Sequence, residues 1–236
     1  MAAKSKKIVI SLMLIILTLC VFDFFLRKYD ASLFSNWVTS YDNGNDIAAK
    51  DFAKKMDWFD EQGSAYYLAH IDVSDSIHLS GRDKTAKLLG ALDRLEKARF
   101  TILGANKRPF VMLKASINAL LGDKQRADEY AKKACKLNRP MTVEECLNGP
   151  LSFDDPEGSR WMAVQYYEQA ILYNVVGSGD KTRSKFYEAV ALKYFDVASA
   201  NLVFKELVRD GHVTSEMRKT YCNPVSPVDS AVCKGK

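Results

Sequence analysis

The chain offers few residues that could carry out imidazole chemistry, because it contains only three histidines, His70, His78 and His212. On a helix, His70 and His78 would lie two turns apart, about 12 Å, which is too far for both to bind one metal. Asp75 and His78 are one turn apart and could supply two ligands, but the sequence offers no third. A solvated or helix-capping role is favoured for these side chains.

Two other segments contain residue types found in ligand sites but lack the required spacing. Residues 177–182, Gly-Ser-Gly-Asp-Lys-Thr, do not match the sequence pattern of a phosphate-binding loop. Asp180 is better explained as a helix cap. Asp154, Asp155 and Glu157 do not have the spacing of a calcium-binding loop and fit the start of a helix. The chain also lacks a Gly-x-Ser-x-Gly motif. We therefore predict no catalytic residue, no cofactor, no metal and no enzymatic activity.

Besides Cys20, the chain has four cysteines, Cys135, Cys146, Cys222 and Cys233. An even number favours an oxidising compartment, although four reduced thiols remain the alternative. Four cysteines allow three connectivities, and the local one, Cys135–Cys146 with Cys222–Cys233, would fasten a helix end and a proline-rich tail. Zinc is disfavoured because no two cysteines have the short spacing typical of zinc sites.

Aromatic residues occur as pairs or close neighbours on the expected helices, so some of them should point away from any single core. We consider them candidates for a partner-binding surface, where Tyr and Trp are enriched. Packing between consecutive helices is the favoured alternative. The candidates are Trp58, Tyr66, Tyr67, Trp161, Tyr166 and Tyr167.

Residues 8–26 form an apolar run of nineteen residues that contains one charge, Asp23. This is close to the roughly 20 residues that a membrane-spanning helix needs, so we predict a transmembrane anchor preceded by a cytoplasmic segment, residues 1–7. Asp23 lies near the far end of this run. A position of its carboxylate at the membrane interface is therefore favoured over pairing with another protein inside the membrane. The run is too long for a typical signal peptide, and Leu19 disfavours a lipoprotein signal at Cys20.

The net charge of +5 belongs mainly to this anchor. Residues 1–28 carry five basic side chains and one acidic one, which leaves 29 basic and 28 acidic side chains in the remainder. A near-neutral domain does not predict nucleic-acid binding. The lysines before the anchor and the four cysteines together favour a protein of the bacterial inner membrane whose C-terminal domain faces the periplasm.

The rest of the chain has the sequence pattern of successive helices. Polar residues precede each expected helix, apolar residues recur at three- and four-residue intervals, and Gly or Pro follows its end. Runs of alternating β-branched residues are absent, so we predict an all-α fold. Residues 29–45 are expected to be a juxtamembrane connector, 46–221 the helical domain and 222–236 a tail. Caps are expected at Thr142 and Asp155. Helices are predicted at 46–61, 64–80, 83–104, 108–121, 123–138, 156–176, 181–197, 199–210 and 214–221.

Residues 112–140 place small side chains on two consecutive expected helices, with a turn between them and a proline after the second. The positions are Ala115, Ala119, Gly122, Asp123, Ala127, Ala131, Ala134 and Pro140. This segment resembles a tetratricopeptide unit. Related patterns lie 36 residues to either side, whereas most such units repeat every 34, and residues 141–158 interrupt the third copy. An irregular α-bundle is therefore the alternative to an array of helical hairpins.

The resemblance implies protein binding, because stacked helical hairpins form an extended concave surface. We accordingly expect an accessory or scaffold subunit, anchored in the membrane, whose helical domain binds a protein partner in a larger complex. The alternative is a membrane-anchored envelope enzyme or small-ligand carrier with a helical pocket. Its acid or metal-binding groups would be Asp75, His78, Asp154 or Asp155.

Overall fold

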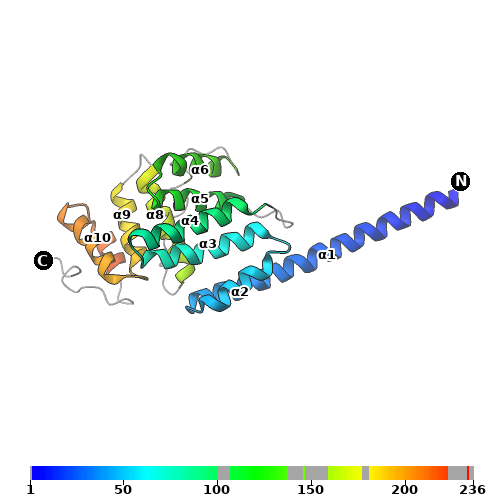
Figure 1. Ribbon diagram of the computed structural model, residues 1–236, viewed down its shortest axis with the longest axis horizontal. Coiled ribbons are helices and arrows are strands. Elements are labelled where there is room, and N and C mark those ends of the chain that lie inside the picture. Colours follow the sequence, from blue (N-terminus) through cyan, green and yellow to red (C-terminus); the bar gives the residue numbers. More distant parts are fainter. Residues whose placement is uncertain are drawn as a thin grey trace.

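A computed structural model of the chain is shown in Figure 1. The structure describes residues 2–99, 107–137, 146, 159–176, 181–222 and 233, and the side chains from residue 11 onward within these ranges, except that of Lys107. The expected caps at Thr142 and Asp155, and most of the 222–236 tail, lie outside the described residues. Within the described ranges the chain forms ten helices and no strand, which confirms the all-α prediction.

All nine helices expected between residues 46 and 221 are present. The largest difference is at α4, which ends at Lys97 because Ala98 adopts an extended backbone. The helices are α1 (Ala2–Asp42), α2 (Asp46–Met56), α3 (Glu61–Ile77), α4 (Gly81–Lys97), α5 (Lys107–Leu120), α6 (Lys124–Lys136), α8 (Arg160–Val176), α9 (Lys181–Leu192), α10 (Val197–Arg209) and α11 (Ser215–Tyr221).

Helix α1 is one continuous helix of 41 residues that projects from the domain toward the N-terminus (Figure 1). It contains the predicted anchor, residues 8–26, although the side chains of residues 8–10 lie outside the described residues. Among the residues that the structure describes, no helix is both long enough and apolar enough to span a membrane.

The structure differs from the expected connector at residues 29–45, because α1 continues through them to Asp42. Leu26, Leu33, Trp37 and Tyr41 are buried along one side of this part of the helix. Their spacing of four and seven residues is that of a helix face packed on a core. The folded domain thus begins near Leu26, about twenty residues earlier than predicted.

The end of α1 and the start of α2 are defined by two adjacent residues. Gly44 has φ +73°, a left-handed conformation that ends the helix and that residues with a Cβ atom disfavour. The side chain of Asn45 then accepts a hydrogen bond from the backbone N–H of Ala48 and caps α2. This tight turn sends α2 back along α1 in the opposite direction.

Consecutive helices pack as neighbours: α1 with α2, α3 with α4, α5 with α6, and α9 with both α8 and α10. Helix α8 is central, because it also contacts α1, α3, α5 and α6. In Figure 1 the domain extends from α1 and α2 at one end to α10 at the other. Helix α8 therefore connects the two ends.

The α5–α6 pair contains the small residues that the sequence singled out. Ala115, Ala119, Ala127 and Ala131 are buried in one cluster with side chains of α8. Small side chains allow the two helix backbones to approach closely. Pro140, which was expected to follow the pair, lies outside the described residues.

Candidate functional site

The first candidate site is the apolar shaft, defined here as residues 12–25 of α1. Its large hydrophobic side chains are all 46–66% exposed. They point in every direction around the helix, whereas a helix on the surface of a soluble domain is apolar on one side only. Continuous exposed apolar surface of this kind marks contact with a membrane or with another protein. The side chains are Leu12, Met13, Leu14, Ile15, Ile16, Leu17, Leu19, Val21, Phe22, Phe24 and Phe25.

Charged residues mark the end of the apolar shaft. Asp23 accepts a hydrogen bond of 2.8 Å from the Nε–H of Arg27, one turn further along α1. The ammonium of Lys28 lies 4.8 Å from the centre of the Phe24 ring. Both basic side chains thus extend back toward the shaft, the direction in which helical side chains tilt. Because Asp23 has a partner on its own helix, its presence does not require a charged partner from another protein.

The second candidate site is the junction where the end of α1, the start of α2, α3 and the start of α8 meet. Arg160, the first residue of α8, donates two hydrogen bonds to the carboxylate of Asp46. It also donates to the hydroxyl of Ser74 over 3.1 and 2.9 Å. Its guanidinium lies 4.3 Å from the centre of the Tyr41 ring. One cation thereby connects α1, α2, α3 and α8.

The carboxylate of Asp42, the last residue of α1, caps the start of α8. Its Oδ1 accepts a hydrogen bond of 2.9 Å from the backbone N–H of Trp161 and one of 3.3 Å from the Ser159 hydroxyl. The first N–H groups of a helix have no partner within the helix, and the helix dipole favours a negative charge beside them. The end of the long helix therefore contributes directly to the stability of α8.

Asp75, considered above as an acid or metal ligand, lies among basic groups at the edge of this junction. Its carboxylate is 2.9 Å from Lys87, 3.8 Å from Arg160 and 3.9 Å from Lys50. The hydrogen bond to Asp75 raises the pKa of Lys87, against a smaller opposing effect of burial. These contacts occupy Asp75 as an ion-pairing group.

Neighbouring Asp72 pairs in the same way with Arg94 at 2.6 Å and with Lys87 at 3.4 Å. His78, the other residue of the considered metal pair, is the C-cap of α3, and its ring packs against Phe195. In the part of the chain that the structure describes, no three metal-binding side chains gather in one place. Asp154 and Asp155 lie outside that part.

A buried pair that the sequence did not indicate lies beneath the junction. The Nδ1 of His70 is 3.1 Å from the Oε1 of Glu168, and both side chains are almost fully buried. The relative orientation of the two side chains does not meet the geometry of a hydrogen bond. The rings of Tyr66 and Trp161 each lie 4.5 Å from the imidazole. The two residues are far apart in the sequence, so only the tertiary fold brings them together.

The aromatic residues proposed for partner binding divide into two groups. Tyr66, Tyr67 and Trp161 pack against one another, and the rings of Tyr67 and Trp161 also contact Trp37. Tyr166 and Tyr167 are each only 6% exposed and belong to the core between α8, α9 and α10. Trp58 is 59% exposed. Of the six, Trp58 is thus the one whose ring is mainly available to another molecule.

A cleft of about 310 Å³ separates the start of α3 from the end of α4. Its charged lining residues include Glu61, Asp93, Arg94 and Lys97. The two basic groups are paired, Lys97 with Asp93 at 2.7 Å and Arg94 with Asp72. With Asp57 also in the lining, the cleft has three acidic and two basic side chains, and both basic side chains are paired, so neither is available to an anionic ligand.

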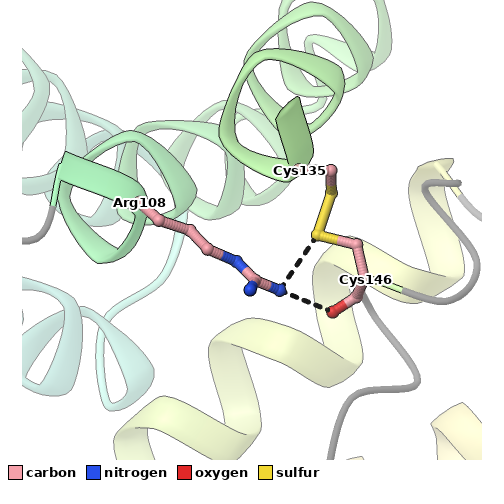
Figure 2. The surroundings of a disulfide bond; sticks show 3 residues. All are labelled: Arg108, Cys135 and Cys146. Atoms are coloured by element: carbon pink, nitrogen blue, oxygen red, sulfur yellow. Dashed lines mark hydrogen bonds between the residues drawn. A yellow bond between two sulfur atoms is a disulfide. The ribbon is translucent and has the colours of Figure 1, made fainter. Parts of the chain in front are cut away.

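The four cysteines other than Cys20 form the two local disulfides, Cys135–Cys146 and Cys222–Cys233. Cys20 is free and exposed on α1. Figure 2 shows Arg108 reaching the first disulfide from α5, where its Nη2 lies 3.2 Å from the Sγ and 3.3 Å from the carbonyl oxygen of Cys146. The disulfide and Arg108 thus connect the end of α6 to the start of α5.

Comparison with known proteins gave no relative: no family model, no curated protein and no solved structure matches the chain.

Proposed function

We propose that the protein is a membrane-anchored accessory subunit: residues 8–26 hold it in the inner membrane, and its helical domain binds a protein partner in the periplasm. The observation that carries the proposal is the continuity of α1. The same helix presents the apolar shaft and then, from Leu26, becomes part of the domain core. A helix with no break between the two would hold the domain at a set distance from the bilayer.

Membrane insertion is supported by the energetics of the apolar shaft. Removing a large apolar side chain from water is favourable by about 1.5–3 kcal/mol. Eleven such side chains are exposed on the shaft. The nineteen residues from 8 to 26 would extend about 28 Å as a helix, close to the roughly 30 Å of a bilayer's hydrocarbon core.

A periplasmic location of the domain is supported by the two disulfides, since such bonds persist in oxidising compartments. The three lysines before the shaft, Lys4, Lys6 and Lys7, favour a cytoplasmic position for the segment that they occupy. The two observations favour the same orientation.

Protein binding is supported by the helical pairs and by the resemblance of residues 112–140 to a tetratricopeptide unit. Helices α3–α4 and α5–α6 form successive pairs, and stacked pairs create extended binding surfaces. Asp75, the one acidic group of the enzyme alternative that lies within the described residues, is engaged in ion pairs instead.

Membrane insertion can be tested by placing charges on the shaft. Ile16→Arg with Leu17→Arg, near its middle, should release the full chain from bacterial membranes under an alkaline wash, because each Arg costs roughly 3 kcal/mol at the bilayer centre. Ile47→Arg with Leu202→Arg is the matched control, since these side chains are 85% and 65% exposed on the domain. Retention of both variants in the membrane fraction would contradict the proposed anchor.

Partner binding can be tested by affinity purification of the full chain from native membranes in mild detergent. The proposal expects a second protein to co-purify in stoichiometric amount and to remain after the control substitutions at Ile47 and Leu202. Recovery of a monomer that retains a metal or a small molecule would contradict it and favour a ligand carrier.

A further inference from the structure

We infer that Trp58 rests in the headgroup layer of the bilayer and holds one end of the helical domain against the membrane surface. The inference rests on the proposed membrane anchor and adds a second point of contact to it. Trp58 lies in the turn between α2 and α3, 59% exposed.

The antiparallel course of α2 brings its C-terminal end back to the level at which the shaft ends. Met56 and Phe59 are buried in one cluster with Leu26 and Leu33 of α1. The ring of Phe59 lies 6.0 Å from that of Tyr29. In Figure 1 the α2–α3 turn is accordingly on the side of the domain that faces the projecting part of α1.

Trp58 is next to this cluster, but most of its side chain is exposed. Its ring centre is 4.8 Å from that of Phe59, in an edge-to-face arrangement. Tyr29 is three residues beyond Leu26, the last residue of the proposed span, which is about 4.5 Å along a helix. The headgroup region on each side of a bilayer is roughly 5–7 Å thick. A side chain at the level of Tyr29 therefore lies at headgroup depth.

The chemistry of the residues at this level suits that position. Trp is enriched at membrane interfaces because its ring is apolar and its N–H can still bond to water or headgroups. Arg27, Lys28, Lys54 and Lys55 are exposed at the same end of the domain. Two of these charges are balanced, since Arg27 pairs with Asp23 and Lys55 with Asp51. The contact should therefore depend on the Trp58 ring more than on anionic lipid.

The inference can be tested with the full chain in phosphatidylcholine vesicles whose acyl chains are brominated close to the headgroup, using unbrominated vesicles as the reference. Bromine quenches Trp emission on contact. Trp37 is fully buried and Trp161 packs between helices, so quenching should come from Trp58. We expect Trp58→Phe to abolish the bromine-dependent quenching and Trp161→Phe to preserve it.

The possible outcomes separate this inference from the proposed anchor. If the native chain floats with the vesicles but shows no quenching, or if quenching persists in Trp58→Phe, the domain contact is overturned and the anchor stands. If the chain does not float with the vesicles, the anchor itself is overturned. An unchanged urea midpoint for Trp58→Phe, expected for an exposed ring, would show that lost quenching is not due to misfolding.

Discussion

Arg160 and Asp46 form a two-pronged ion pair that joins the first residue of α8 to the first residue of α2, 114 positions apart in the chain. The pair is largely enclosed, with 15% of the Arg160 side chain and 29% of the Asp46 side chain exposed. Because α8 packs at the centre of the domain, this contact fixes the α1–α2 pair to the remaining helices. It adds to the direct packing of α2 on α3 and of α1 on α8.

Substitution of Arg160 should therefore lower the stability of the domain. Arg160→Lys keeps the positive charge but loses the planar guanidinium that donates two hydrogen bonds to Asp46. We therefore expect the free energy of unfolding to fall by about 1–2 kcal/mol. Arg160→Met leaves Asp46 without its partner and should cost about 2–4 kcal/mol. Urea titration of the full chain in mild detergent, followed by Trp fluorescence, measures both.

Lys97→Met is the control for the Arg160 variants, because Lys97 forms an exposed ion pair with Asp93 on the surface of α4. Exposed pairs of this kind contribute about 0–1 kcal/mol. If Arg160→Met were no less stable than Lys97→Met, the ion pair at the junction would not be what fixes the α1–α2 pair.

The Cys135–Cys146 disulfide should stabilise the part of the fold that contains the α5–α6 pair. Replacing both cysteines with serine should lower the free energy of unfolding by about 2–3 kcal/mol, the value expected when a loop of this size is no longer closed. Cys20→Ser, which removes the free exposed thiol, is the control and should leave the urea midpoint unchanged.

Thiol labelling examines the same disulfide and its partner, Cys222–Cys233, directly. In the protein isolated from the cells that naturally produce it, an alkylating reagent added after unfolding should label Cys20 alone, and four more cysteines after reduction. Labelling of five thiols without reduction would remove the main support for a periplasmic domain. It would leave the apolar shaft and its proposed insertion unaffected.

Glu188 on α9 should make the stability of the domain dependent on pH. Burial raises the pKa of its carboxyl above the ordinary 4.5, and the nearby Lys185 and Lys84 oppose this only in part. The folded protein then binds this proton more tightly than the unfolded chain does. The contribution of Glu188 to stability therefore falls as the pH rises from about 4.5 through the raised pKa, and its penalty is complete above that pKa.

Glu188→Gln removes this penalty, because the amide is neutral at every pH. Compared with the native chain, the variant should gain in melting temperature at pH values above the raised pKa and show little difference at pH 4. Glu129→Gln, on the exposed side of α6, is the control. A native-like slope for Glu188→Gln would show that another group causes the dependence.

The helices could be predicted from local patterns, whereas the start of the domain could not. Leu26, Leu33, Trp37 and Tyr41 have helical spacing, but the residues between them are rich in Ser, Asn and Thr, which have weak helix propensity. Packing against α2, α3 and α8 outweighs that local preference. The regular spacing of large apolar side chains was therefore the signal to follow across residues 29–42.

The contacts within the junction could not be predicted for a different reason. Asp46, considered alone, is an acidic residue in the first turn of a helix, and Arg160 is a basic residue near the start of another. Nothing local indicates that they bind each other. The contact between His70 and Glu168 could not be predicted either, because the partner of a buried polar group depends on the tertiary fold.

Trp37 offers a test of how the centre of the aromatic core is stabilised. Its ring is fully buried, stacked on Tyr41 at 4.9 Å and in edge-to-face contact with Trp161 at 4.9 Å. Its indole N–H has no hydrogen-bond partner among the described residues. A buried N–H without a partner is unfavourable by about 1–3 kcal/mol. The ring contacts must therefore outweigh that penalty.

Two substitutions at Trp37 separate these contributions. Trp37→Ala removes the ring and should cost about 3–5 kcal/mol. Trp37→Phe keeps most of the ring contact and removes the unpaired N–H, so its cost should stay below about 1.5 kcal/mol. Phe204→Leu is the reference for loss of a buried ring without relief of a polar group, since Phe204 is fully buried against Tyr221. Urea unfolding followed by circular dichroism avoids the change in Trp emission. If Trp37→Phe were as damaging as Trp37→Ala, the indole N–H would have to be contributing to stability through a contact of its own.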